Sequence, residues 1–308
     1  MWKYVIKRLL ALIPVVAGCT FIVFMIMHLS PGDPATFVLG QDATPEAIHD
    51  WREMHGLNYP VLVQYFYYII GVFQGDFGTS FTRNVSITEE VMSRFPYTAR
   101  LASAALSFSL LIAFPIGIIS AVKQNTWIDG VSMFVALLGL SMPVFWLGLL
   151  LILFFSLNLG WLPSSGAQHW NSVILPGITL GTGMMAAMAR TTRSSMLEVI
   201  RQDYIRTARA KGLSNGRVIR KHAIRNALIP TLTILGIQMG NLLTGSVITE
   251  NVFAWPGIGR LMVQGILARD YPMVLGCMVM FVLCFALINL LVDLAYAFVD
   301  PRIRAQYR

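Results

Sequence analysis

The chain has 308 residues, of which 56% are apolar and 12% are charged, with a formal net charge of +8. Soluble domains carry about 25% charged residues, so this composition excludes an ordinary soluble protein and indicates a chain that lies in lipid. The positive charge is not gathered into a separate basic domain, so nucleic-acid binding is not predicted.

Five stretches contain no Asp, Glu, Lys or Arg, and their lengths suit helices that cross a membrane. They are Leu9 to Gly32, Leu101 to Val122, Gly130 to Ala189, Asn226 to Thr249 and Tyr271 to Val292. About 20 residues of α-helix cross a hydrocarbon core, so four stretches hold one span each and the third holds two. The sequence therefore predicts an all-α polytopic protein with six transmembrane helices and membrane lipid around them.

Residues 1–32 are predicted to form a cytoplasmic N-terminus and the first transmembrane helix. Lys3, Lys7 and Arg8 precede the apolar run, as in a signal peptide. The run continues past Cys19 to Met27, however, which favours a helix that is retained.

Residues 33–94 are predicted to form a small extracytoplasmic cap. Pro31 and Pro34 end the first helix, Pro45 to Met54 suit a short helix, and Tyr65 to Ile70 suit the membrane interface. Within the short helix His49, Asp50, Glu53 and His55 lie close in sequence, but an amphipathic outer helix carries such residues routinely. No metal site is predicted there, nor at the cysteines, which all lie in apolar spans: Cys19, Cys277 and Cys284.

Residues 95–293 are predicted to form the core of helices two to six, and residues 294–308 the end of helix six and a cytoplasmic tail. Span two contains Pro115 and span three, Val131 to Asn158, contains Pro143, and both prolines are expected to kink their helices. A surface turn at residues 160–166 leads into span four, Ser172 to Ala189. Its many Gly and Ala residues predict a place inside the bundle.

The distribution of basic residues predicts the orientation. With the N-terminus in the cytoplasm, 17 of the 23 Lys and Arg residues fall on the cytoplasmic side. The other six fall outside: Arg52, Arg83, Arg94, Arg100, Arg260 and Arg269. The positive-inside rule therefore places both termini in the cytoplasm.

The long cytoplasmic loop at residues 190–230 is predicted to be ordered. Leu197, Ile200, Tyr204 and Ala208 follow at helical spacing and predict one apolar helix face, which would enter a groove on a partner. Gly212 suits a left-handed residue at the end of that helix. Ser214 after it suits the cap of a second helix, so the loop is predicted to be a helix, a glycine turn and a helix.

This loop resembles the coupling loop of ABC importer permeases, in the form found in the dipeptide and oligopeptide branch. The resemblance lies in Tyr204-Ile205-Arg206-Thr207-Ala208-Arg209-Ala210-Lys211-Gly212 and in His222-Ala223-Ile224-Arg225-Asn226-Ala227-Leu228-Ile229-Pro230. Further matches extend over the whole chain: Gly32-Asp33-Pro34, Gly75-Asp76-Phe77-Gly78, Trp255 to Arg260, Arg269-Asp270-Tyr271-Pro272, Asn289 with Asp293, and Asp300-Pro301-Arg302. The chain departs from the wider family at Arg206-Thr207-Ala208, where Glu-Ala-Ala is usual, and at Ile224-Arg225, where Leu-Pro is usual.

The resemblance implies a type I ABC importer transmembrane fold and a set of partners. These are a homologous second permease subunit, two cytoplasmic ATPase subunits and an extracytoplasmic substrate-binding protein. The sequence has no Gly-Lys pair and so no Walker loop, which implies that the partner ATPases bind ATP and Mg and that this chain has no cofactor and no catalytic residue. The residues implied in ATPase coupling are Tyr204, Arg206, Thr207, Ala208, Ala210, Lys211, Gly212 and Leu213.

Uncharged polar side chains inside apolar spans are candidates for the solute path, because such groups need partners or water. They are Ser141, Thr179, Thr182, Gln238, Asn241 and Thr244. Hydrogen bonding between helices is the alternative role for these residues.

The sequence disfavours two other classes of function. An ion-coupled secondary transporter would need ionisable groups at mid-membrane, whereas Glu250 and Asp293 fall near span ends. An intramembrane enzyme would need a triad or a His pair around a Glu, and neither motif occurs. The resemblance implies di- and oligopeptides as the favoured solutes, with glutathione, nickel chelates and oligosaccharides as alternatives.

Overall fold

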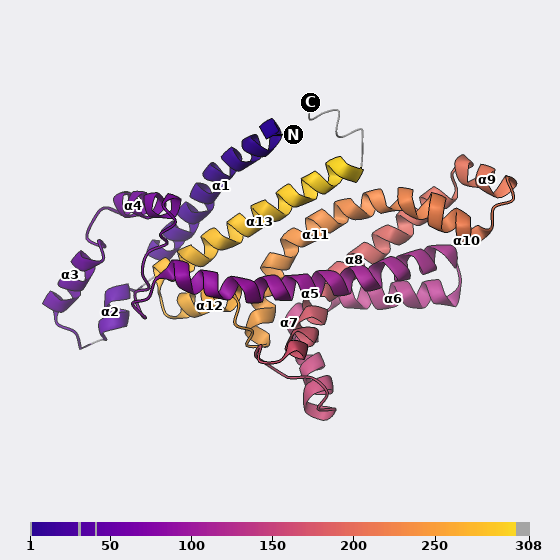
Figure 1. Cartoon of the computed structure of the whole chain (residues 1–308). Coiled ribbons are helices and arrows are strands. Elements are labelled where there is room, and N and C mark those ends of the chain that lie inside the picture. Colours follow the sequence, from indigo (N-terminus) through magenta and orange to yellow (C-terminus); the bar gives the residue numbers. More distant parts are fainter. Residues whose placement is uncertain (1, 30–31, 41, 300–308) are drawn as a thin grey trace. The chain divides into compact units, whose positions relative to one another are not determined.

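The computed structural model describes residues 2–29, 32–40 and 42–299, and Figure 1 shows them as helices joined by turns. In this described part the secondary structure is helical, apart from one β-bridge between Thr79 and Ser86. The predicted all-α class is confirmed. The chain divides into two compact units, one of residues up to Thr98 with Pro256–Leu287, the other of Ala99–Trp255 with the residues from Ile288 onward.

The first unit contains four helices of the N-terminal region, the whole of α12 and parts of two other helices. They are α1 (Trp2–Leu29), α2 (Pro34–Leu39), α3 (Pro45–Met54), α4 (Val61–Phe73), the start of α5 (Ile87–Val122), α12 (Ile258–Leu267) and the start of α13 (Tyr271–Val299). Asp33 and Thr44 cap α2 and α3 with their side chains, and each cap is followed by a proline at the first helical position. The predicted short helix at residues 45–54 is therefore present, whereas Pro31 lies outside the described residues.

The aromatic helix α4 packs on α1. The Tyr65 hydroxyl hydrogen-bonds near the middle of α1, at the Ala17 carbonyl and the Thr20 hydroxyl. Apolar side chains on the other side of α4 are exposed, among them Leu62 and Phe66. Such a helix suits the interfacial position that the sequence predicts.

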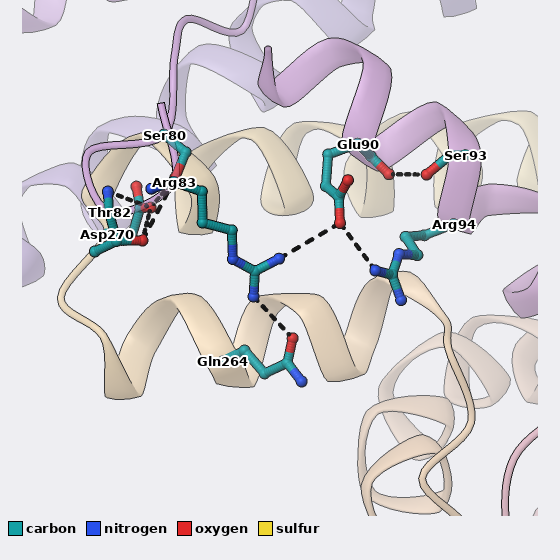
Figure 2. A network of polar contacts seen from close by, with 8 residues as sticks. All are labelled: Ser80, Thr82, Arg83, Glu90, Ser93, Arg94, Gln264 and Asp270. Atoms are coloured by element: carbon teal, nitrogen blue, oxygen red, sulfur yellow. Dashed lines mark hydrogen bonds and ion pairs between the residues drawn. The ribbon is translucent and has the colours of Figure 1, made fainter. Parts of the chain in front are cut away.

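A buried carboxylate joins the loop at residues 76–86 to the start of α13 (Figure 2). Asp270 is only 1% exposed and accepts hydrogen bonds from the hydroxyls of Ser80 and Thr82. Its carboxylate also accepts from the backbone N–H groups of Phe81, Thr82 and Met273, at 3.2, 3.3 and 3.4 Å. One side chain thus satisfies donors that lie about 190 positions away in the sequence.

Next to this carboxylate, Figure 2 shows Arg83 between α12 and α5. Its guanidinium donates to the Gln264 side chain at 3.3 Å and lies 3.5 Å from the Glu90 carboxylate. Glu90 also pairs with Arg94 at 2.9 Å. Arg83 therefore holds the loop at residues 76–86 on α12 and α5, in addition to the hydrogen bonds that the loop donates to Asp270.

The second unit contains the remaining helices. They are the rest of α5, α6 (Trp127–Ser141), α7 (Val144–Leu151), a π-helix (Ile152–Asn158), a 3-10 turn (Trp170–Val173), α8 (Ile174–Ile200), α9 (Asp203–Ala210), α10 (Asn215–Val218), a second π-helix (Ile219–Ala223), α11 (Ile224–Val252) and the end of α13. The turn predicted at residues 160–166 is present, and Gly160 and Gly166 have positive φ.

Helix α8 lies at the centre of this unit, against α6, α7 and α11. Its glycines permit a close approach to α5, since a Cβ at Gly181 would lie 2.6 Å from the Ala105 carbonyl oxygen. On α5, a Cβ at Gly117 would lie 2.7 Å from the Ala189 carbonyl oxygen. The interior position predicted for the fourth span is confirmed.

Two predictions about helix boundaries are wrong. The third span is not one kinked helix: α6 ends at Ser141, Met142 is extended, and the helices on either side of Pro143 differ in direction by 107°. The reason is that a residue before proline is driven out of the α region. The fourth span does not end near Ala189 but continues as α8 to Ile200. At Pro115, by contrast, α5 continues without a break.

Within the described residues, three helices are long and apolar enough to cross a membrane, Ile87–Val122, Trp170–Ile200 and Tyr271–Val292. The number becomes five if each of two bent pairs forms one span, and Ile13–Leu29 is a shorter apolar helix. The count of six spans stays a prediction.

Candidate functional site

The predicted coupling loop folds as a short helix closed by a glycine turn. Gln202 is extended, α9 runs from Asp203 to Ala210, and Gly212 has φ +78°. The N–H of Leu213 bonds to the Ala208 carbonyl, and the N–H of Gly212 bonds to the Arg209 carbonyl at 2.9 Å. These two bonds form a Schellman motif, which requires a left-handed residue at the glycine. The predicted glycine turn is confirmed.

The residue that follows the turn begins the next helix. Ser214 is extended and stands at the N-cap of α10, where its carbonyl oxygen accepts from the N–H groups of Arg217 and Val218. Its hydroxyl makes no capping bond. The sequence therefore placed the start of the helix correctly, but the predicted side-chain cap is absent from α10.

The apolar face of α9 packs on its own unit. Ile205 and Ala208 are buried in a cluster with Met196 of α8, Val218 of α10 and Ala121 at the end of α5. This corrects the predicted face, because Leu197 and Ile200 belong to α8 and Tyr204 is 42% exposed. Ala208, at 6% exposure, faces the interior of this unit.

The opposite face of α9 and its turn are exposed and mainly polar or basic. It presents Tyr204, Arg206, Thr207, Arg209, Ala210, Lys211 and Gly212. The Tyr204 hydroxyl accepts a hydrogen bond from the Asn226 amide at the start of α11, at 2.9 Å. Arg206 lies 3.7 Å from the exposed Asp203 carboxylate, where solvent screens the interaction. Six of the eight predicted coupling residues thus lie on this exposed face or turn, whereas Ala208 is buried and Leu213 is half-buried against the apolar cluster.

The candidate path residues fall into two groups. Thr179 is 1% exposed and Thr182 is half-buried, and both hydroxyls bond to carbonyls one turn earlier in α8, at Leu175 and Ile178. The structure does not place Thr179 on an open surface. Ser141 and Asn241 are exposed and Gln238 is half-buried, and the Asn241 amide donates to the Gln238 side chain at 2.8 Å. The side chain of Thr244 lies outside the described residues, as does that of Asp293.

A buried ion pair was missed by reasoning from the sequence. Asp129, in the first turn of α6, is 5% exposed and accepts two parallel bonds of 2.7 Å from the Arg193 guanidinium of α8. The Ser120 hydroxyl and the Asn125 N–H, at the end of α5 and in the turn after it, also donate to this carboxylate. The one signal in the sequence is an acidic residue at the edge of a long apolar stretch.

Two models of known protein families match the chain. The model of the binding-protein-dependent transport system inner membrane component matches residues 113–305, and the model of the N-terminal part of such membrane components matches residues 1–102. The chain belongs to this family of ABC importer permeases. The predicted family is confirmed, and the ion-coupled alternative is set aside.

Two curated relatives match this permease over 99% of its length. A dipeptide transport system permease, DppB of Alkalihalophilus pseudofirmus, is 47% identical over 332 residues and is covered in full. A glutathione transport system permease, GsiC of Salmonella choleraesuis, is 47% identical over 304 residues, with 99% of that protein covered.

Solved structures show that the permease has the type I ABC importer fold. An inward-facing structure of the MetNI methionine ABC transporter matches with a TM-score of 0.58 and 20% identity, over 68% of this chain and 96% of the other. An amino acid ABC transporter solved with histidines matches with a TM-score of 0.52 and 17% identity, over 70% and 94%. Membership of the family makes the permease a multi-pass protein of the inner membrane that works with ATPase and binding-protein components.

Proposed function

We propose that this permease, paired with a homologous second permease subunit, forms the path by which short peptides enter the cytoplasm. Two separate cytoplasmic ATPase subunits bind ATP and Mg, an extracytoplasmic binding protein delivers the peptide, and this chain catalyses no reaction itself. ATP-driven closure of the ATPases moves the helices between inward-facing and outward-facing states. Both termini lie in the cytoplasm, and residues 33–94 lie outside.

The observation that carries this proposal is the exposed face of α9. Because Ile205 and Ala208 are buried and the Schellman turn fixes the end of the helix, α9 is held as a rigid projection of the second unit. Its accessible side chains include Arg206, Arg209 and Lys211, which suit a groove that carries acidic residues. A partner ATPase that binds this face can transmit movement to α8 and α11, at the ends of which α9 lies (Figure 1).

The relatives support a peptide as the solute. One is named for dipeptides and the other for glutathione, which is a γ-linked tripeptide, and both match with the same identity. A backbone amide, an amino group and a carboxylate are common to these solutes. The two relatives described above do not point to nickel chelates or oligosaccharides.

Orientation is tested by labelling introduced cysteines in intact cells. In a variant without Cys19, Cys277 and Cys284, we expect Asp50→Cys to react with a membrane-impermeant maleimide. Asn215→Cys should react only after the cells are opened, because the positive-inside rule places the loop at residues 190–230 in the cytoplasm. The reverse pattern of labelling would invert the proposed topology.

Transport is tested with the complete complex in proteoliposomes, using a labelled dipeptide and labelled glutathione. We expect ATP-dependent uptake of at least one of them. Gln238→Phe and Asn241→Phe should reduce uptake by about tenfold or more, because each replaces a polar side chain of the proposed path with a bulky apolar ring.

The matched control is Asn251→Phe on the same helix, since the Asn251 amide is exposed and bonds only to the Val247 carbonyl of its own helix. This variant should transport normally. If the two path variants also kept normal uptake at normal abundance, the path would lie elsewhere. If neither solute were transported, the peptide assignment would be wrong.

A further inference from the structure

The α9 loop and the last turn of α5 are packed together. The apolar cluster that buries Ile205 and Ala208 includes Met196 near the end of α8 and Ala121 near the end of α5. Tyr204 adds a hydrogen bond to the start of α11. A displacement of α9 therefore acts on α8 at residues close to Arg193, which lies one turn before Met196.

Helix α6 carries one charged residue, and that residue is Asp129 in its first turn. Its carboxylate is held by both arms of the Arg193 guanidinium, and Ser120 and Asn125 satisfy further lone pairs. A bidentate pair fixes direction as well as distance. Separation of the two charges would leave the buried Asp129 carboxylate without its cation, which is unfavourable, so the first turn of α6 is expected to follow Arg193 when α8 moves.

The other end of α6 is the break at residues 141–144. Ser141 is exposed there, and the chain turns by 107° into α7. Two residues before the break, Gly139 lies so close to α8 that a Cβ would be 2.7 Å from the Thr182 methyl carbon. Helix α6 is thus fixed to α8 near both ends, by the Asp129–Arg193 ion pair at the first turn and by close packing near the break.

We propose that the Arg193–Asp129 pair mechanically couples α8 to α6. Movement of α9 is thereby transmitted to α6 and to the break beside Ser141. Arg193 and Asp129 are positioning residues in this role, because they touch neither ATP nor solute. The proposal rests on the coupling role proposed for α9. It predicts that the pair stays closed throughout the ATP cycle.

The test measures the accessibility of Ser141 in the whole complex. Ser141→Cys is introduced in a permease without the three native cysteines, and its rate of reaction with a water-soluble maleimide is compared without nucleotide and with the ATPases trapped by ATP and vanadate. We expect the rate to change by about tenfold in the parent. The measured labelling rate does not depend on which solute is transported.

The pair is then replaced in two ways. Asp129→Asn leaves the partly buried Arg193 guanidinium without its counter-ion and is expected to abolish the change in rate, with some loss of abundance. The double variant Asp129→Leu with Arg193→Met fills the same space with apolar groups and should restore folding and ATPase binding. In this double variant we still expect the two labelling rates to differ by less than about twofold.

Lys123→Gln is the matched control, because it removes an exposed charge from the same α5–α6 turn and should leave the tenfold change intact. A tenfold change in the labelling rate of the double variant would contradict the role proposed for the Arg193–Asp129 pair. So would an unchanging rate in a parent complex that imports peptide. Failure of the ATPases to co-purify with the parent would instead count against the coupling role of α9.

Discussion

Gly212→Val is expected to abolish most uptake and most co-purification of the ATPases while the permease still inserts in the membrane. Gly212 has φ +78°, and a Cβ built there meets no atom within 4 Å, so backbone strain alone opposes the substitution. That strain is about 1–2 kcal/mol for an ordinary residue and greater for a β-branched one. It lowers the population of the closed turn by about five- to thirtyfold or more.

Gly216→Val supplies the matched control for this experiment. Gly216 lies in α10 with equally open space around it, but its φ is not positive. The same side chain is therefore expected to leave binding and uptake unchanged. Equal effects of the two substitutions would mean that the left-handed turn is not what positions α9.

Asp270→Asn is expected to destabilise the first unit by about 3 kcal/mol or more. The carboxylate accepts five hydrogen bonds from the cap and from α13, whereas an amide of the same size directs an NH₂ group at some of those donors. Buried hydroxyl and N–H groups are then left unsatisfied. The measurement is the temperature at which half of the purified complex aggregates, together with permease abundance in membranes.

Asp76→Asn makes the same chemical change a few residues from the Ser80 end of this network. The Asp76 carboxylate is exposed and accepts a bond from the Gly78 N–H at 2.8 Å. Its substitution should shift the midpoint by no more than a few degrees, because an exposed acceptor is readily replaced by water. A similar midpoint for the two variants would contradict the role given to Asp270.

The turn of the candidate site could be predicted because its signals are local. A glycine after a helical pattern and a serine two residues later mark the end of one helix and the start of the next, and the structure has both boundaries. The break at Pro143 was underestimated as a kink. Sequence gives the position of a proline, but the packing around it decides whether the helix continues, as α5 does at Pro115.

Long-range partners could not be predicted in the same way. Asp129 and Arg193 are 64 residues apart, and Asp270 is about 190 residues from its donors in the cap. Spacing also failed to show which residues of the α9 region face inward. Tyr204 and Ala208 share one helical spacing, yet Tyr204 is exposed while Ala208 and Ile205 are buried, because packing on α8, α10 and the end of α5 decides which face of α9 is covered.

The close contact of α5 with α8 limits the motions that are open to the second unit. At Gly117 and Gly181 the backbone of one helix lies against the side chains or carbonyl groups of the other, without the layer of side chains that usually separates two helices. Sliding by even one residue would drive a methyl-sized group into a carbonyl oxygen. These two helices can therefore tilt only as a pair, and bending is left to the backbone at Met142 and Pro143, where the helical hydrogen bonds are interrupted.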